Sequence, residues 1–298
     1  MGCGKIKQVM KNKLLSFGHG YSAQALENLL PINNWTLSAT TRNLKKAQLM
    51  RQRKISTFIW PGDNLEDEIF NATHILLSIP PDGAGDPIFK QYGDIIVRSK
   101  NLKWLGYLST TGVYGDHKGG WVDESTELKP TTQRGANRLV AENQWLQLSK
   151  KNSLCLSIFR LAGIYGLGRG PFSKVLAGTA RRIIKKNQVF SRIHVDDIAQ
   201  VLFASLNNPH LKGIYNVCDD FAAPPEDVLS YAAKLLEKDL PPEEDFLSAK
   251  MSEMARSFYA ESKRVKNSKI KYNLGVTLKY PDYKSGLKSL FEQEFNNK

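Results

Sequence analysis

Short apolar runs alternate with amphipathic stretches along the first two thirds of the chain. Runs of four to eight mainly apolar residues are typical of strands in a buried sheet. Strands are predicted at Leu14–Phe17, Thr36–Thr40, Ile55–Trp60, His74–Ile79, Leu102–Leu108, Leu154–Arg160 and Ile214–Val217. Helices are predicted at Ser22–Leu30, Thr132–Leu148 and Asp196–Leu206. Strands separated by helices imply right-handed crossovers, so we expect an α/β fold with a doubly wound parallel sheet.

The pattern changes after Cys218. A helix is predicted from about Ala222 to Lys238, where Pro241 and Pro242 prevent its continuation, and a terminal amphipathic helix at Tyr283–Phe295. We expect two domains: a main domain of residues 12–163 and 191–218, and a small lobe of residues 164–190 and 219–298. The small lobe should cover the carboxyl edge of the sheet, where such folds bind ligands.

Composition excludes several classes of protein. The 298 residues are 41% hydrophobic, and no apolar run is long enough to span a membrane. Lysines at 5, 7, 11 and 13 leave no apolar stretch for a secretory signal. Three cysteines far apart (Cys3, Cys155 and Cys218) argue against a disulfide scaffold or a zinc ribbon. The sequence therefore predicts a cytoplasmic protein with no membrane partner, either a monomer or a homodimer.

The net charge of +13 is concentrated in residues 1–54 and 151–298. A basic surface can attract nucleic acid, but no nucleic-acid motif is present, so that partner is not expected. The charge fits either a solvated surface or attraction for an anionic cofactor or substrate.

A glycine-rich loop follows the first predicted strand and opens the first helix: Gly18-His19-Gly20-Tyr21-Ser22-Ala23. This G-x-G-x-x-A pattern allows a tight turn, close approach of a pyrophosphate, and close packing of helix on strand. The loop predicts dinucleotide binding.

The second predicted strand bears on which dinucleotide binds. It ends at Thr41-Arg42, without the Asp or Glu that usually binds the ribose hydroxyls of NAD. A guanidinium there would pair with a 2′-phosphate, so NADP is preferred over NAD; the alternative is an ordinary first-turn arginine.

Two further strand ends are candidates for cofactor contacts. Asp63 and Asn64 follow the third strand, where an acid can bind the adenine amino group. Ser78 and Pro80 end the fourth, where the chain should pass under the cofactor. Turn formation explains these residues equally well.

The segment Leu108-Ser109-Thr110-Thr111-Gly112-Val113-Tyr114-Gly115-Asp116 resembles the active-site strand of extended short-chain dehydrogenase/reductases, the NAD(P)-dependent epimerase/dehydratase-like group. The segments Phe159–Gly166, Arg192–Ala199 and Tyr215–Val217 fit the same family in order and spacing. The resemblance, which spans about residues 12–290, implies a Rossmann-like domain with a small substrate lobe.

In that family a Ser or Thr orients the substrate, a tyrosine exchanges its proton, and a lysine four residues later lowers the tyrosine's pKa. Thr110 stands at the Ser/Thr position, but Arg134 and Arg138 occupy the tyrosine and lysine positions. Arginine keeps its proton and cannot replace the tyrosine as an acid/base. Two alternatives stay open: Arg134 and Arg138 clamp a substrate anion, or they begin a solvated helix.

Other residues are weaker candidates. The family packs Tyr114 under a loop, His117 lies in a loop that could fold over the nicotinamide, and His194 should anchor the start of its helix. The histidines show no metal spacing, so no metal site is expected. The segment from Ser262 to Asn267 resembles an atypical subgroup of the family; its Lys263 and Arg264 would either reach a substrate anion or, as we expect, form solvated surface.

The sequence thus favours an NADP-binding, epimerase/dehydratase-like oxidoreductase that acts on an anionic small molecule at an atypical active site. The alternative is a catalytically silent NADP-binding sensor or scaffold.

Overall fold

The computed structural model describes residues 11–296, so the segment in which we expected no secretory signal lies largely outside the described residues. Its main body is a seven-stranded, all-parallel sheet in the order β11-β7-β5-β4-β1-β2-β3. The predicted α/β, Rossmann-like fold is confirmed. The strands are β1 (Asn12–Phe17), β2 (Trp35–Thr41), β3 (Ser56–Ile59), β4 (His74–Leu77), β5 (Trp104–Thr110), β7 (Leu156–Leu161) and β11 (Gly213–Val217).

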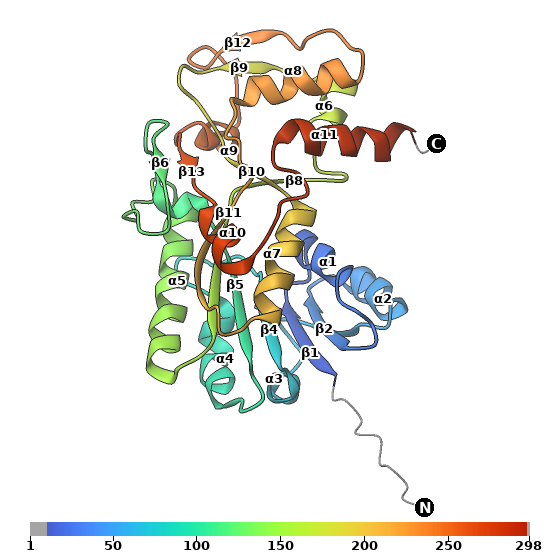
Figure 1. The fold of residues 1–298 in the computed structure, drawn as a ribbon, viewed down its shortest axis with the longest axis vertical. Helices are drawn as coiled ribbons and strands as arrows, with labels where there is room; N and C mark the ends of the chain where they lie inside the picture. Colours follow the sequence, from blue (N-terminus) through green and yellow to red (C-terminus); the bar gives the residue numbers. More distant parts are fainter. Residues whose placement is uncertain (1–10, 297–298) are drawn as a thin grey trace, which may run out of the picture.

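Helices cover both faces of the sheet (Figure 1). The helices of this domain are α1 (Tyr21–Glu27), α2 (Leu44–Gln52), α3 (Glu66–Asn71), α4 (Pro87–Arg98), α5 (Gln133–Asn152) and α7 (Val195–Asn207), with the 3₁₀ turn η1 (Thr111–Tyr114). Successive strand residues point to opposite faces, so Leu14 and Leu76 pack with α1 and α7, whereas Leu15 and Leu77 pack with α3, α4 and α5. Helix α10 (Ser268–Leu274) lies within the residues predicted for the small lobe, but its Ile270 and Leu274 belong to the same apolar core as α1 and α7.

The predicted elements are all present, with shifted ends. The first helix ends at Glu27 and not at Leu30, because Leu29 and Leu30 close turns onto Leu26 and Glu27. The helix after Cys218 ends at Leu235 and not at Lys238. Helices α2, α3 and α4 were not predicted.

The small lobe lies above the carboxyl ends of the strands in Figure 1. Phe172, Val228, Tyr283 and Leu287 contribute to its own apolar core. The division into two domains stays a prediction. The elements of the lobe are α6 (Phe172–Leu176), β9 (Arg182–Ile184), α8 (Pro225–Leu235), β12 (Glu243–Asp245), α9 (Glu253–Phe258), α11 (Tyr283–Phe291) and the π-helical turn η2 (Glu292–Asn296).

Two short parallel pairs connect the lobe to the sheet. Strand β8 (Gly163–Tyr165) pairs with β10 (Arg192–His194), and β6 (Trp121–Val122) pairs with β13 (Arg264–Val265). We call residues 261–266, which contain β13, the strap. No helix within residues 11–296 is long and apolar enough to cross a membrane.

Candidate functional site

Gly18 makes the tight turn at the end of β1. Its φ is +79°, and a Cβ there would lie 2.8 Å from Cγ1 of Ile79, so only glycine fits without displacement. The Gly18 N–H donates to Oγ1 of Thr40 on β2 (2.8 Å). The Ser78 hydroxyl, next to β4, lies within hydrogen-bond distance of both the Phe17 carbonyl (3.0 Å) and the Gly18 carbonyl. The ends of three neighbouring strands therefore fix the loop.

The next residues fit a dinucleotide pyrophosphate. Gly20 caps α1 without a side-chain hydrogen bond, which leaves the first-turn N–H groups free of such a cap. A Cβ at Gly20 would meet no atom closer than 3.8 Å, so its side of the loop is open. Ser22 and Ala23 are buried, and the small Ala23 packs into the core beneath.

His19 is the buried member of this loop. Its Nε2 lies 2.9 Å from a carboxylate oxygen of Glu27, and burial lowers the pKa of the imidazole although Glu27 opposes the shift. The Lys46 ammonium, from α2, donates to the His19 carbonyl. Neither contact was predicted from the sequence. The basic pair Lys45-Lys46, shortly after Arg42, was the one local sign that a lysine could lie near the glycine loop.

The residues predicted to contact the adenosine differ in their surroundings. Arg42 is exposed at the end of β2, with its side chain free of hydrogen bonds and ion pairs to residues 11–296, and the Thr41 hydroxyl accepts from Asn43 N–H (3.2 Å). Asp63 accepts from Ile59 N–H (2.7 Å), and Asn64 accepts from Glu66 N–H (3.0 Å). Pro80 is exposed. Asp63 and Asn64 thus make turn contacts, which was the alternative to a contact with adenine.

Thr110 ends β5 and begins η1, where its Oγ1 accepts from Gly112 N–H (3.1 Å). The start of α5 packs directly on this turn, because a Cβ at Gly135 would lie 2.6 Å from the Gly112 carbonyl. Thr110 and the first turn of α5 therefore adjoin, as the family's active site requires.

A buried polar network lies behind Thr110. Ser109 donates to Glu142 (2.5 Å), and Arg160 forms a 2.7 Å ion pair with Glu142 while also donating to the Tyr114 hydroxyl (2.9 Å). The Tyr114 hydroxyl donates to Asn216 (2.7 Å). Burial raises the pKa of Tyr114 to about 12, and its side chain is fully enclosed. Tyr114 is thus poorly placed to exchange a proton with a substrate.

The two arginines of α5 have different surroundings. Arg138 donates to the Tyr107 hydroxyl (3.1 Å) and the Leu108 carbonyl (2.5 Å), and its guanidinium lies over the Tyr107 ring. Arg134 is exposed, and its side chain has no hydrogen bond or ion pair within residues 11–296. Arg138 is held against β5, and the clamp of Arg134 and Arg138 stays a prediction.

The strap contains a buried lysine where solvated surface was expected. Lys263 is not solvated: its residue is 8% exposed, and its ammonium donates to Glu261 (2.5 Å) and to the Gly115 carbonyl (2.7 Å). Glu261 also accepts from the Thr131 hydroxyl (2.7 Å), and Arg264 donates to the Gly119 carbonyl. A buried charge pair therefore joins the strap to the loop between η1 and α5.

Two histidines have structural contacts. His117 contacts the Tyr114 carbonyl through Nε2 (3.2 Å), and its backbone N–H donates to Ser262 of the strap. His194 accepts from Asp196 N–H and so begins α7, as expected. No cluster of three or more potential metal-ligating side chains occurs within residues 11–296.

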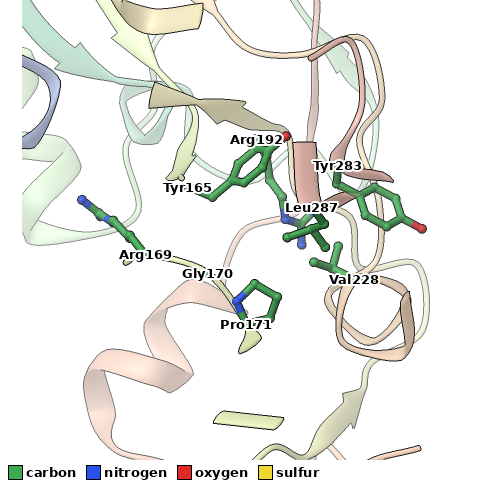
Figure 2. Close-up of a pocket in the computed structure, with 8 residues that line it drawn as sticks. All are labelled: Tyr165, Arg169, Gly170, Pro171, Arg192, Val228, Tyr283 and Leu287. Carbon is green, nitrogen blue, oxygen red and sulfur yellow. The ribbon is translucent and has the colours of Figure 1, made fainter. Parts of the chain in front are cut away.

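A cavity of about 280 Å³ opens in the small lobe. The segment that forms one side of the cavity contacts the glycine loop. The Tyr21 hydroxyl donates to the Leu167 carbonyl (2.9 Å), and the Arg169 guanidinium lies 5.8 Å from the centre of the Tyr21 ring. Its lining residues, drawn in Figure 2, are Tyr165, Arg169, Gly170, Pro171, Arg192, Val228, Tyr283 and Leu287.

Comparison with solved structures supports the fold over nearly the whole chain. A functionally unknown conserved protein from Silicibacter pomeroyi DSS is 49% identical, with a TM-score of 0.89 over 96% of this chain and 100% of that one. UDP-glucuronic acid 4-epimerase from Bacillus cereus, in complex with UDP-glucuronic acid and NAD, is 15% identical (TM-score 0.74; 95% and 100% covered). dTDP-glucose 4,6-dehydratase from Bacillus anthracis str. Ames, in complex with NAD, is 16% identical (TM-score 0.75; 96% and 98% covered).

A search of curated proteins gave no significant match. A family model does match residues 96–218, which include β5, Thr110, α5, β7 and β11. The matched segment contains the Thr110 turn and the buried network behind it, within a fold shared with epimerases and a dehydratase along the full chain. Residues 96–218 therefore match the NAD dependent epimerase/dehydratase family, and the chain shares the fold of the epimerase and dehydratase structures.

Proposed function

We propose that this protein is an NADP-binding, epimerase/dehydratase-like oxidoreductase that acts on an anionic small molecule. The observation that carries the proposal is the contact of the Thr110 turn with the first turn of α5, at the same sheet edge as the open glycine loop. Residues for cofactor and substrate therefore gather at one edge, as in other doubly wound sheets.

The preference for NADP rests on charge. Arg42 is exposed at the end of β2, with Lys46 in the first turn of the following helix. Two cations and no acid at this position favour a ribose with a 2′-phosphate over one with a free hydroxyl.

The chain's own residues define the remaining chemistry. NADPH, when bound, supplies a hydride. The Thr110 hydroxyl can donate a hydrogen bond to a substrate oxygen while its oxygen accepts from Gly112. Arg134 and Arg138 supply positive charge for a developing oxyanion but retain their protons.

The second candidate, a catalytically silent sensor, is favoured by one specific observation. The two tyrosines nearest Thr110 in sequence, Tyr107 and Tyr114, are both enclosed, and burial raises the pKa of both hydroxyls, that of Tyr114 to about 12. No tyrosine stands at the family's acid/base position, so the dinucleotide would remain unreacted and its binding would be the output.

One experiment separates the two. The protein with NADPH is offered a library of anionic carbonyl compounds, and NADPH oxidation is followed by absorbance. An oxidoreductase oxidises NADPH with at least one compound, and Thr110→Val removes that rate. Thr36→Val, the same change on the exposed start of β2, is the matched control. NADPH that survives the whole library favours the sensor, and turnover that is unchanged in Thr110→Val contradicts our placement of the active site.

A further inference from the structure

The small-lobe cavity combines positive charge with apolar walls. Among its lining residues the polar side chains are two arginines and two tyrosines, and the rest are apolar or glycine. None is a carboxylate or an amide. For the hydroxyl groups of a sugar, the lining side chains therefore offer only the two tyrosine hydroxyls as hydrogen-bond acceptors.

Arg192 supplies the inner charge of the cavity. Its Nη1 donates to the carbonyls of Phe190 and Ala223, each at 2.9 Å, which fixes the guanidinium in place. It forms no ion pair within the described residues 11–296. Burial lowers its pKa, although the nearby carboxyl of Asp219 opposes the shift. Figure 2 shows this guanidinium beside Leu287, among the lining residues. A partly desolvated cation with no carboxylate at ion-pair distance is costly, and a bound anion would lower this cost.

The walls around Arg192 suit an apolar group. Val228 and Leu287 belong to the core of the lobe, and the rings of Tyr165 and Tyr283 stand beside them. The wall of Tyr165 is firmly packed, because a Cβ at Gly286 would lie 2.1 Å from the Tyr165 hydroxyl. The volume of about 280 Å³ lies just below the range of roughly 300–1,000 Å³ typical of ligand pockets, which favours a small occupant.

We propose that this cavity binds a compact organic anion, a carboxylate or phosphate attached to an apolar, ring-sized body, in preference to a nucleotide sugar. This proposal rests on the proposed function, because it names the substrate class for the same enzyme. Arg192 binds the anionic head group and Val228 and Leu287 contact the body. Arg169, which extends toward Tyr21, places the cavity beside the cofactor loop.

Binding of simple probes tests the proposal without knowledge of the substrate. Benzoate, phenyl phosphate, inorganic phosphate and UDP-glucose are titrated calorimetrically into the full-length protein, with and without NADP. We expect benzoate or phenyl phosphate to bind at least tenfold more tightly than inorganic phosphate and UDP-glucose. The tighter of the two aryl probes identifies the head group. An equal or higher affinity for UDP-glucose overturns the proposal, as does an equal affinity for inorganic phosphate.

Variants locate the site. Arg192→Gln should weaken the aryl anion roughly tenfold or more, the effect of losing a charge-assisted hydrogen bond, and Arg169→Gln should weaken it less. Arg181→Gln, which removes an arginine of the lobe that pairs with Glu244, is the matched control and should leave affinity unchanged. Equal affinity in Arg192→Gln and wild type overturns the assignment.

A structural measurement tests the proposal even if Arg192→Gln does not fold. In crystals of the wild type soaked with 4-bromobenzoate, anomalous scattering should place bromine between Val228 and Leu287. Bromine found at other places and not there overturns the proposal. Titration with NADP alone distinguishes failure of this proposal from failure of the proposed function. A wild-type protein that binds benzoate but not NADP would refute the proposed function and leave the anion site intact.

Discussion

At the scale of single residues, we expect Arg42 to decide the choice of cofactor. We expect Arg42→Asp to weaken NADP binding by about 2–3 kcal/mol, because a charge-assisted hydrogen bond becomes a repulsion. NAD binding should change far less, since NAD has no 2′-phosphate. Titration of both dinucleotides checks this, with Lys90→Asp on exposed α4 surface as the control for the change in charge. Equal losses for NAD and NADP would remove Arg42 from this role.

Asp219 should give the protein a pH-dependent stability. Burial raises the pKa of its carboxyl to about 8, and its Oδ2 has no hydrogen-bond partner within residues 11–296. An unfolded aspartate ionises near pH 4, so between about pH 4 and 8 the folded state holds a proton that the unfolded state has lost. The free energy of unfolding therefore falls as pH rises through this window.

Asp219→Asn removes that dependence. The stability of the variant relative to wild type should rise by up to about 1.4 kcal/mol per pH unit from pH 4 to 8 and then level off. Urea unfolding of both proteins at pH 5, 7 and 9 measures the difference. Asp227→Asn gives the effect of the same change on an exposed residue. A difference that stays constant with pH would show that Asp219 is ionised in the folded protein.

The site was only partly predictable from residue patterns. The loop Gly18–Ala23 and Thr110 stand where the motifs placed them, because each motif is defined by backbone geometry over a few neighbouring residues. The positions of Lys263 and Arg138 were not foreseeable in the same way. Their environment depends on residues far along the chain, and a lysine in a basic run gives no sign that it will be buried.

At the scale of elements, the strap depends on its buried ion pair. Lys263→Met should lower the free energy of unfolding by about 3 kcal/mol, because the Glu261 carboxylate loses its counter-ion while it stays enclosed. Lys266→Met, on the same strap but half exposed and 3.9 Å from Asp123, should change it by less than about 0.5 kcal/mol. Chemical unfolding measures both.

A second variant checks the cause of that loss. The double change Glu261→Gln with Lys263→Met removes both charges and should cost less than Lys263→Met alone. A double variant that is less stable than the single one would mean that packing, and not the unpaired carboxylate, explains the effect.

The elements show which patterns carry information. The central strands β1, β4, β5 and β7 were predicted because both of their faces are largely buried, so each gives a short apolar run. Helix α4 was missed although Asp86 accepts hydrogen bonds at its start and Pro87 occupies its first turn, a recognisable start signal. Strands β6 and β13 have two residues each and exist only because the strap reaches the loop, so no local pattern could have revealed them.

At the scale of the whole molecule, we expect the two predicted domains to unfold together. The chain passes between them three times, and the pairs β8–β10 and β6–β13 join them. All five tryptophans lie in residues 12–163, so their fluorescence reports the main domain alone, whereas circular dichroism reports helices of both. The two signals should give the same unfolding midpoint. An earlier transition in circular dichroism without a fluorescence change would mean that the lobe unfolds independently.

The hydrogen bond from Tyr21 to the Leu167 carbonyl has a consequence for how the ligands interact. Tyr21 begins the helix that would face the pyrophosphate, and Leu167 precedes the segment of Arg169 and Gly170 that forms one wall of the cavity. A dinucleotide that orders the first turn of α1 should also order this wall through the hydrogen bond. An anion that orders the wall should order the turn in the same way. Because such coupling is reciprocal, each ligand should increase the affinity of the other by the same factor. The protein would then respond to the joint presence of cofactor and anion more steeply than to either alone.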